Sequence, residues 1–182
     1  MKTVTATNKK SETSAVSMRR MTVTAVMAAM ITLMTAYIFH IPVGVNGGYI
    51  HLGDALIYLA ACILPMPYAC AAGMIGGGLA DLMTAPLWAP ATIIIKALIC
   101  IPFSAKGNKI ITKRNILAII LSGCITIVGY YIAEGILYGY TAAFLVTISG
   151  NVIQAAGSGV VFFILGTALD KLGFKAKFGK DL

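Results

Sequence analysis

Charged residues are nearly absent from a long stretch of this chain. Between Met21 and Phe103 there are only three of them, Asp54, Asp81 and Lys96. Over all 182 residues, 59% are hydrophobic and 11% are charged, whereas soluble domains carry about 25% charged residues. A chain this short cannot cover so much apolar surface in water, so its surroundings must be lipid. The sequence excludes a soluble globular domain and predicts an all-α integral membrane protein.

Six apolar segments, separated by charged residues, prolines or glycines, predict a bundle of six transmembrane helices. Their approximate ranges are 21–39, 54–64, 68–83, 90–103, 116–138 and 142–169. The second to fourth segments are shorter than the ~20 residues that a perpendicular helix needs. Because lipid cannot satisfy exposed backbone groups, we expect these short helices to line a cavity.

Three basic clusters determine the predicted orientation. They are Lys2, Lys9, Lys10, Arg19 and Arg20; Lys106, Lys109, Lys113 and Arg114; and Lys171, Lys175, Lys177 and Lys180. With six spans all three clusters lie on one side, and the loops on the other side contain no Lys or Arg. The positive-inside rule then places both termini in the cytosol. Anionic lipid headgroups account for the net charge of +8, so no nucleic-acid partner is expected.

This layout divides the chain into three parts. Residues 21–172 form one six-helix membrane domain. Residues 1–20 are polar and are expected to be a disordered, basic cytosolic tail, and residues 173–182 a second basic cytosolic tail.

Four ionisable residues lie in or beside the spans, namely Asp54, Asp81, Lys96 and Glu134. Each is a candidate functional residue, because a charge at the bilayer centre costs at least about 2.5 kcal/mol. The six-span layout gathers them in the outer half, where the last span adds two amides on one helical face, Asn151 and Gln154. This convergence favours an outward-facing polar pocket. The alternative is that Lys96 pairs with one carboxylate only to hold helices together.

The first outer loop, residues 41–53, is long, rich in glycine and carries Asn46, Tyr49 and His51. Such a loop over a pocket often acts as a lid, and a plain connector is the alternative. The two histidines, His40 and His51, have no third nitrogen or sulfur ligand nearby, so neither a metal nor another cofactor is expected.

Small residues at four-residue spacing allow helices to approach closely in lipid. In the first span the pair is Ala25 and Ala29, where an external partner is a plausible use. The triple glycine at 76–78 lacks the Lys-Ser/Thr of a phosphate-binding loop, and no serine or cysteine nucleophile stands beside a base. The chain therefore has no nucleotide-hydrolysing motif and is not expected to be an enzyme.

Four segments resemble, in order, the substrate-binding S component of energy-coupling factor (ECF) transporters. They are GYIHLGDALIYLAA (48–61), AAGMIGGGLADLMT (71–84), WAPATIIIKAL (88–98) and SGNVIQAAGSGVV (149–161). The resemblance covers most of residues 20–170 and is most specific at GYIHLGD and APAT-x-x-x-K.

The resemblance implies a six-helix binding protein in a bacterial plasma membrane that captures a vitamin or related micronutrient at the outer face. Its partners would be a membrane T component and two cytosolic ATPases. Ala25 and Ala29 match the family's docking motif. The implied pocket, joined with the charge-derived one, contains Asn46, Tyr49, His51, Asp54, Asp81, Trp88, Lys96, Tyr130, Glu134, Asn151 and Gln154.

A pocket with a cation, carboxylates and two amides suits a small polar heterocycle, on which Tyr49, Trp88 or Tyr130 would stack. A deazapurine tRNA-modification precursor, hydroxymethylpyrimidine or a B6 vitamer fits these groups. Pantothenate would fit by placing its carboxylate on Lys96. Two other classes stay open: a membrane-embedded enzyme that uses Asp54, Asp81 and Glu134 on a lipid-linked substrate, and a scaffold whose charges are structural.

Overall fold

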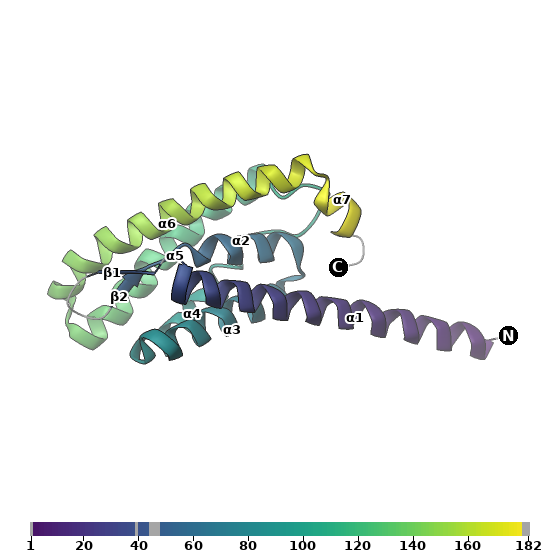
Figure 1. The fold of residues 1–182 in the computed structure, drawn as a ribbon, viewed down its shortest axis with the longest axis horizontal. Coiled ribbons are helices and arrows are strands. Elements are labelled where there is room, and N and C mark those ends of the chain that lie inside the picture. The colour runs from purple at the N-terminus through teal and green to yellow at the C-terminus, as the bar shows by residue number, and fades with distance from the viewer. Residues whose placement is uncertain (1, 39, 44–47, 180–182) are drawn as a thin grey trace.

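The computed structural model describes residues 2–38, 40–43 and 48–179. Long helices in these residues run back and forth between two ends of one bundle (Figure 1). The elements are α1 (Lys2–Leu33), η1 (Met34–Ile38), β1 (Ile41–Val43), β2 (Gly48–Ile50), α2 (Gly53–Ile63), α3 (Met66–Thr84), η2 (Pro86–Trp88), α4 (Ala89–Leu98), α5 (Lys113–Tyr138), α6 (Tyr140–Lys171) and α7 (Phe174–Phe178). We call the end with β1 and β2 the hairpin end, and the end with α7 and the loop 104–112 the basic end.

Helix α2 forms the centre of the bundle, and every residue from Gly53 to Cys62 is buried. Apart from one carboxylate the helix is apolar on all sides, which is typical of a helix surrounded by other helices. It packs against α1, α3 and α6. The ring of Tyr58 stacks on Phe103 with centroids 4.8 Å apart, and Phe162 meets it edge-on at 5.9 Å.

Helix α3 approaches its two neighbours through glycines. A Cβ atom on Gly76 would lie 2.7 Å from the Ile31 Cβ of α1, and one on Gly77 would lie 2.8 Å from the Lys96 Cγ of α4. The hydroxyl of Thr32 also donates to the Gly76 carbonyl at 3.0 Å. The glycine-rich sequence of α3 therefore lets α1 and α4 pack directly on its backbone.

Each of the six predicted helical segments corresponds to a helix, with limits that differ by a few residues except at the start of α1, which begins at Lys2. Within the described residues, three helical stretches have the length and hydropathy to cross a membrane: Ala15–Ile38, Lys113–Tyr138 and Gly150–Lys171. The apolar helices Gly53–Ile63 and Pro86–Leu98 are shorter. At 11 residues, α2 spans only about 16 Å. The structure is therefore that of a mostly helical membrane protein.

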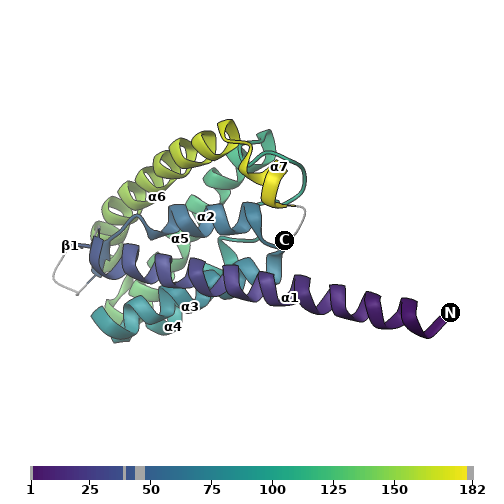
Figure 2. The same ribbon diagram turned by 45° about the vertical axis from the view of Figure 1, so that its right-hand side comes forward.

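Two features differ from the sequence expectation. The segment predicted to be the first outer loop contains a short antiparallel hairpin, in which Ile41 pairs with Ile50 and Pro42 with Tyr49. The strands contain β-branched Ile41, Val43 and Ile50 and the aromatic Tyr49, residue types that suit paired strands. The segment 1–20, expected to be disordered, is helical from Lys2 and continues α1 beyond the bundle (Figure 2). It contains neither Gly nor Pro, so nothing in it interrupts the helix.

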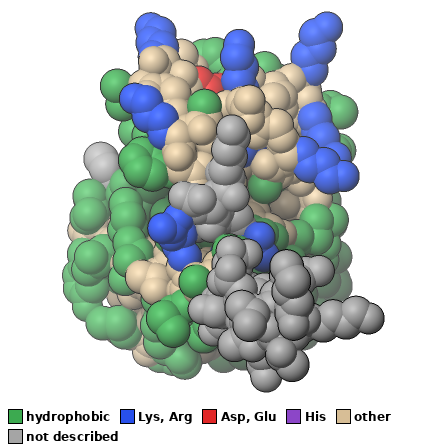
Figure 3. Space-filling view, turned by 90° about the vertical axis from the view of Figure 1, so that its right-hand side faces the viewer, with side chains coloured by type: hydrophobic (Ala, Val, Ile, Leu, Met, Phe, Trp, Pro, Cys, Tyr) green, Lys and Arg blue, Asp and Glu red, His purple; other side chains and the backbone are tan. Residues whose placement is uncertain are grey.

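The basic end is held together by a few polar contacts. Asp170 accepts the backbone N–H groups of Ile110 and Ile111 at 2.7 and 2.9 Å, and Lys175 Nζ donates to the Lys109 carbonyl at 3.4 Å. Lys and Arg side chains gather on this face of the molecule (Figure 3). The central loop and the C-terminal segment therefore lie on the same side of the bundle, as the sequence predicted.

Candidate functional site

A buried ion pair lies in the half of the bundle nearer the hairpin. Asp54 stands in the first turn of α2 and Lys96 in the last turn of α4. Lys96 Nζ lies 2.6 Å from Asp54 Oδ1, and both side chains are fully buried. Burial in an apolar interior makes either charge costly alone, so each stabilises the other.

Gln154 extends this pair to α6 and to the loop before α2. Its Nε2 donates to Asp54 Oδ2 at 3.1 Å, and its Oε1 accepts the backbone N–H of His51 at 3.3 Å. One amide side chain thereby satisfies the second carboxylate oxygen and fixes the base of the hairpin. The predicted helical face of Gln154 does point into the bundle, since the residue is 2% exposed.

His51 is buried two residues before the start of α2. Its Nδ1 accepts the backbone N–H of Gly53 at 3.1 Å, so the neutral ring carries its proton on Nε2. Burial, followed by the nearby charge of Lys96, lowers the pKa of His51 to about 3. The ring is therefore neutral at physiological pH.

The hairpin is tied to α3 by a second polar contact. The hydroxyl of Tyr49 on β2 donates a hydrogen bond to Asp81 Oδ1 near the end of α3. Burial, followed by the negative charge of Asp81, raises the pKa of Tyr49 above its usual value, so the phenol keeps its proton. The ring of His40 stacks on Tyr49 at 3.9 Å between centroids. Asp81 and Tyr49 therefore hold the hairpin against the bundle.

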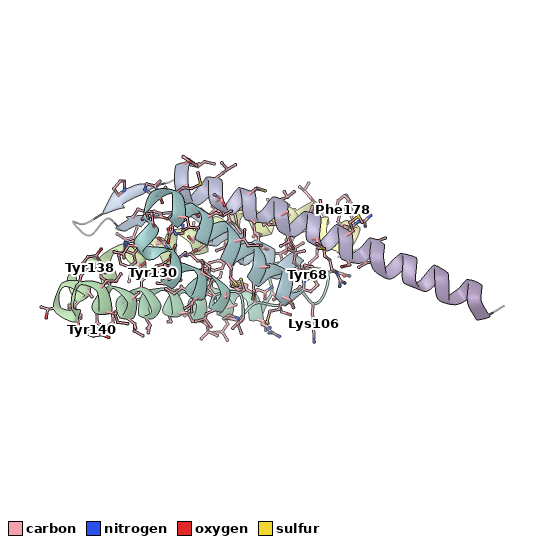
Figure 4. The ribbon with its side chains drawn as sticks, turned by 90° about the horizontal axis from the view of Figure 1, so that it is seen from below. Tyr68, Lys106, Tyr130, Tyr138, Tyr140 and Phe178 are labelled. Carbon is pink, nitrogen blue, oxygen red and sulfur yellow. The ribbon has the colours of Figure 1, made fainter. Side chains whose placement is uncertain are left out.

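Aromatic side chains from η2 and α5 lie beside these groups. The Trp88 ring lies 6.2 Å from Tyr130 and 6.1 Å from Tyr138. Tyr130 and Tyr138 lie at the hairpin end, whereas Lys106 lies at the opposite end (Figure 4). Lys96 Nζ lies 5.3 Å from the centroid of the Tyr130 ring, within range of a cation–π contact. These rings offer flat apolar faces next to polar groups.

The structure brings together most of the predicted pocket residues but not all of them. Glu134 is buried near the end of α5, and Asn151 is half-buried one turn from Gln154 towards the hairpin end. Asn46 lies outside the described residues. Lys96 pairs with the carboxylate of Asp54 at 2.6 Å. The sequence alone did not indicate which carboxylate would be this partner. Ala25 and Ala29 lie exposed on α1.

Sequence reasoning missed Thr92. Its hydroxyl shares a 2.9 Å hydrogen bond with Tyr130 and neighbours the Asp81 carboxylate. The residue stands four positions before Lys96, on the same helical face, and this spacing was the available signal. Among the residues with described placement, no group of three or more His, Cys, Asp or Glu side chains could hold a metal ion.

The arrangement supports binding by shape, stacking and hydrogen bonds. It combines a neutralised ion pair, a neutral histidine, a second carboxylate and several aromatic faces on four helices and a hairpin. Such a mixture of apolar walls and a few fixed polar groups is typical of small-molecule sites.

Comparison with known protein sequences identifies the family of this chain. The family model for the ECF-type riboflavin transporter, S component, matches residues 15–171. A Pyrococcus woesei protein described as an uncharacterized protein in gap 3'region is 29% identical over 140 residues, which cover 76% of this chain and 93% of that protein. The family match includes the hairpin and every helix that contributes to the ion pair. The chain belongs to the ECF-type riboflavin transporter S-component family, whose members are substrate-binding subunits of ECF transporters and not a family of enzymes.

Proposed function

We propose that this chain captures a small polar heterocyclic micronutrient at the hairpin end, for ATP-driven uptake into the cell. The solute is a vitamin, a vitamin precursor or a deazapurine-like or nucleobase-like compound. Riboflavin, the compound in the family's name, belongs to this class because it is a flat heterocycle with polar edges. The proposal rests on one observation, the buried cluster of Asp54, Lys96, Gln154 and His51. This cluster lies beside aromatic rings and under the hairpin.

The site comprises the residues that line this cluster. They are Asn46, Tyr49, His51, Asp54, Asp81, Trp88, Lys96, Tyr130, Glu134, Asn151 and Gln154. Within it the hairpin acts as the lid, because hydrogen bonds of Tyr49 and of the His51 backbone connect it to α3 and α6 above the cluster. Solute enters when these contacts release.

The chain crosses the plasma membrane of a bacterial cell six times, with both termini in the cytosol. The gathering of Lys and Arg at the basic end supports this orientation under the positive-inside rule. The short helix α2 is surrounded by other helices, which shield its backbone from lipid, and α4 buries one face that includes Thr92, Ile95 and Lys96. The hairpin end then faces the outside.

Uptake depends on a membrane T component and two cytosolic ATPase subunits, since the chain has no nucleotide-binding motif of its own. Ala25 and Ala29 form the docking stripe for the T component. Both are exposed on α1, and alanines at this spacing let another helix approach closely.

A thermal-shift screen of the purified chain against micronutrients tests this proposal. A solute at a hundred times its Kd adds about 2.7 kcal/mol to the unfolding free energy, so a true substrate raises the Tm clearly. Cells that express the chain alone should not accumulate that solute, whereas cells with the T component and ATPases should. Turnover of the solute by the isolated chain would indicate an enzyme, and a flat screen would indicate a scaffold.

A further inference from the structure

Asp81 holds a buried carboxylate oxygen without a partner. Oδ1 accepts from Tyr49, whereas Oδ2 has no hydrogen-bond partner within the described part of the chain. The residue is only 3% exposed. Leaving a buried acceptor unpaired costs about 1–3 kcal/mol, and more for a charged one. Such an atom beside a candidate site marks the position of a missing hydrogen-bond donor.

The neighbouring charges decide which donor fits. Lys96 is fully buried against Asp54, so its charge is already compensated and both oxygens of Asp54 are engaged. His51 is neutral, because burial and Lys96 lower its pKa to about 3. The Asp54–Lys96 pair is neutral overall, so the negative charge of Asp81 has no compensating cation in this cluster. An anionic solute would meet this carboxylate, and it could not reach Lys96 without displacing Asp54.

The surroundings of Asp81 are aromatic. Thr92 neighbours its carboxylate and is hydrogen-bonded to the Tyr130 hydroxyl at 2.9 Å, and the Trp88 ring lies 6.2 Å from that of Tyr130. Tyr49 approaches from the hairpin. A flat ring stacked on one of these aromatic side chains would lie beside the Asp81 carboxylate.

We propose that the solute is an aromatic heterocycle that donates a ring or exocyclic N–H group to Asp81 Oδ2 and carries no carboxylate. This assignment rests on the proposed function and narrows its substrate class. The N–H group gains a charge-assisted hydrogen bond, which is stronger than one between neutral groups. Riboflavin, hydroxymethylpyrimidine and an aminomethyl deazapurine satisfy the requirement. Pantothenate and biotin do not, because neither contains an aromatic ring and each carries a carboxylate, which the charge of Asp81 disfavours in this site.

The test uses the full purified chain and two groups of probes, with binding measured by calorimetry. The first group is riboflavin, hydroxymethylpyrimidine and an aminomethyl deazapurine, and the second is pantothenate, biotin and nicotinate. We expect a first-group probe to bind and the carboxylates to fail. Asp81→Asn should weaken that binding by about ten- to a hundredfold, the usual effect of losing a hydrogen bond to a charged group. Asp170→Asn, which removes a carboxylate at the basic end, is the matched control and should keep wild-type affinity.

A second arm keeps the test valid if Asp81→Asn fails to fold. Wild-type protein is titrated with a probe whose donor is blocked, such as 3-methylriboflavin or a dimethylamino form of the pyrimidine, and affinity should fall by a similar factor. Equal binding of parent and methylated probes, or tight binding of a carboxylate, would overturn the assignment. If no probe of either group binds the wild-type chain, the proposed function itself fails and the assignment fails with it.

Discussion

Lys96 Nζ lies 2.6 Å from Asp54 Oδ1, and neither side chain is exposed. The pair connects the end of α4 to the start of α2, and Gln154 extends it to α6. A buried ion pair adds little net stability over an apolar replacement, but removing one partner leaves an uncompensated charge. The pair therefore links α2 and α4 beneath the hairpin, and Gln154 connects it to α6 and to the backbone of His51.

Lys96→Met should strongly destabilise the ligand-free protein. The change leaves the Asp54 carboxylate buried without its cation, which typically costs about 3–5 kcal/mol. Thermal unfolding in detergent should show a large fall in Tm.

The double variant Lys96→Met with Asp54→Asn provides the control, because it removes both charges and leaves an amide that can still accept from Gln154. It should recover most of the lost Tm. A Lys96→Met protein with wild-type Tm would contradict the buried pair.

The neutral state of His51 predicts a pH dependence. Its pKa falls from about 6.5 in the unfolded chain to about 3 in the fold, so the unfolded state binds more protons between these values. The unfolding free energy should therefore be unaffected by His51 above pH 6.5. Below that pH it should decrease by about 1.4 kcal/mol per pH unit.

His51→Asn isolates this contribution, because the amide oxygen can replace Nδ1 as acceptor of the Gly53 N–H and does not titrate. The difference between the Tm curves of wild-type and variant protein, measured from pH 8 to 4.5, should be flat above pH 6.5 and change steadily below it. A difference that stays constant over the whole range would indicate that His51 is free to protonate in the fold.

The helices were predictable because hydropathy, prolines and glycines mark their limits. The six predicted ranges each contain a helix, and the scarcity of charge makes Asp54, Asp81 and Lys96 stand out in the sequence alone. Ionisable residues are energetically costly in lipid, so their presence in apolar spans marks them as candidate functional residues.

Pairing within the site was not predictable in the same way. Asp54, Asp81 and Glu134 were equivalent candidates for Lys96. Which carboxylate reaches it depends on how α2, α3 and α4 pack together, and the structure pairs Lys96 with Asp54 of α2. The hairpin also escaped detection, because three-residue strands produce almost no periodic signal. Long-range contacts of this kind depend on helix packing and not on local sequence.

The proposed orientation predicts opposite labelling at the two ends. In a chain whose four native cysteines are replaced, Leu87→Cys at the hairpin end and Lys106→Cys at the basic end are both exposed. A membrane-impermeant maleimide added to intact cells should label Leu87→Cys and not Lys106→Cys. Permeabilised cells provide the control, since both sites should then react. Labelling of Lys106→Cys alone in intact cells would reverse the orientation.

The exposed alanines of α1 predict a separation of uptake from binding. Replacing Ala25 or Ala29 with Trp places a bulky ring where a partner helix should approach, without filling space inside the bundle, because both positions are exposed. Uptake by cells that contain the T component and ATPases should fall to background, while calorimetry on the purified variants should give wild-type solute affinity.

Ala156→Trp, an equally large change at an exposed position on α6, is the matched control and should retain uptake. If all three variants lose uptake equally, bulk at any lipid-facing position is enough to explain the effect. If the α1 variants lose solute affinity, Ala25 and Ala29 serve the packing of this chain and not the docking of a partner.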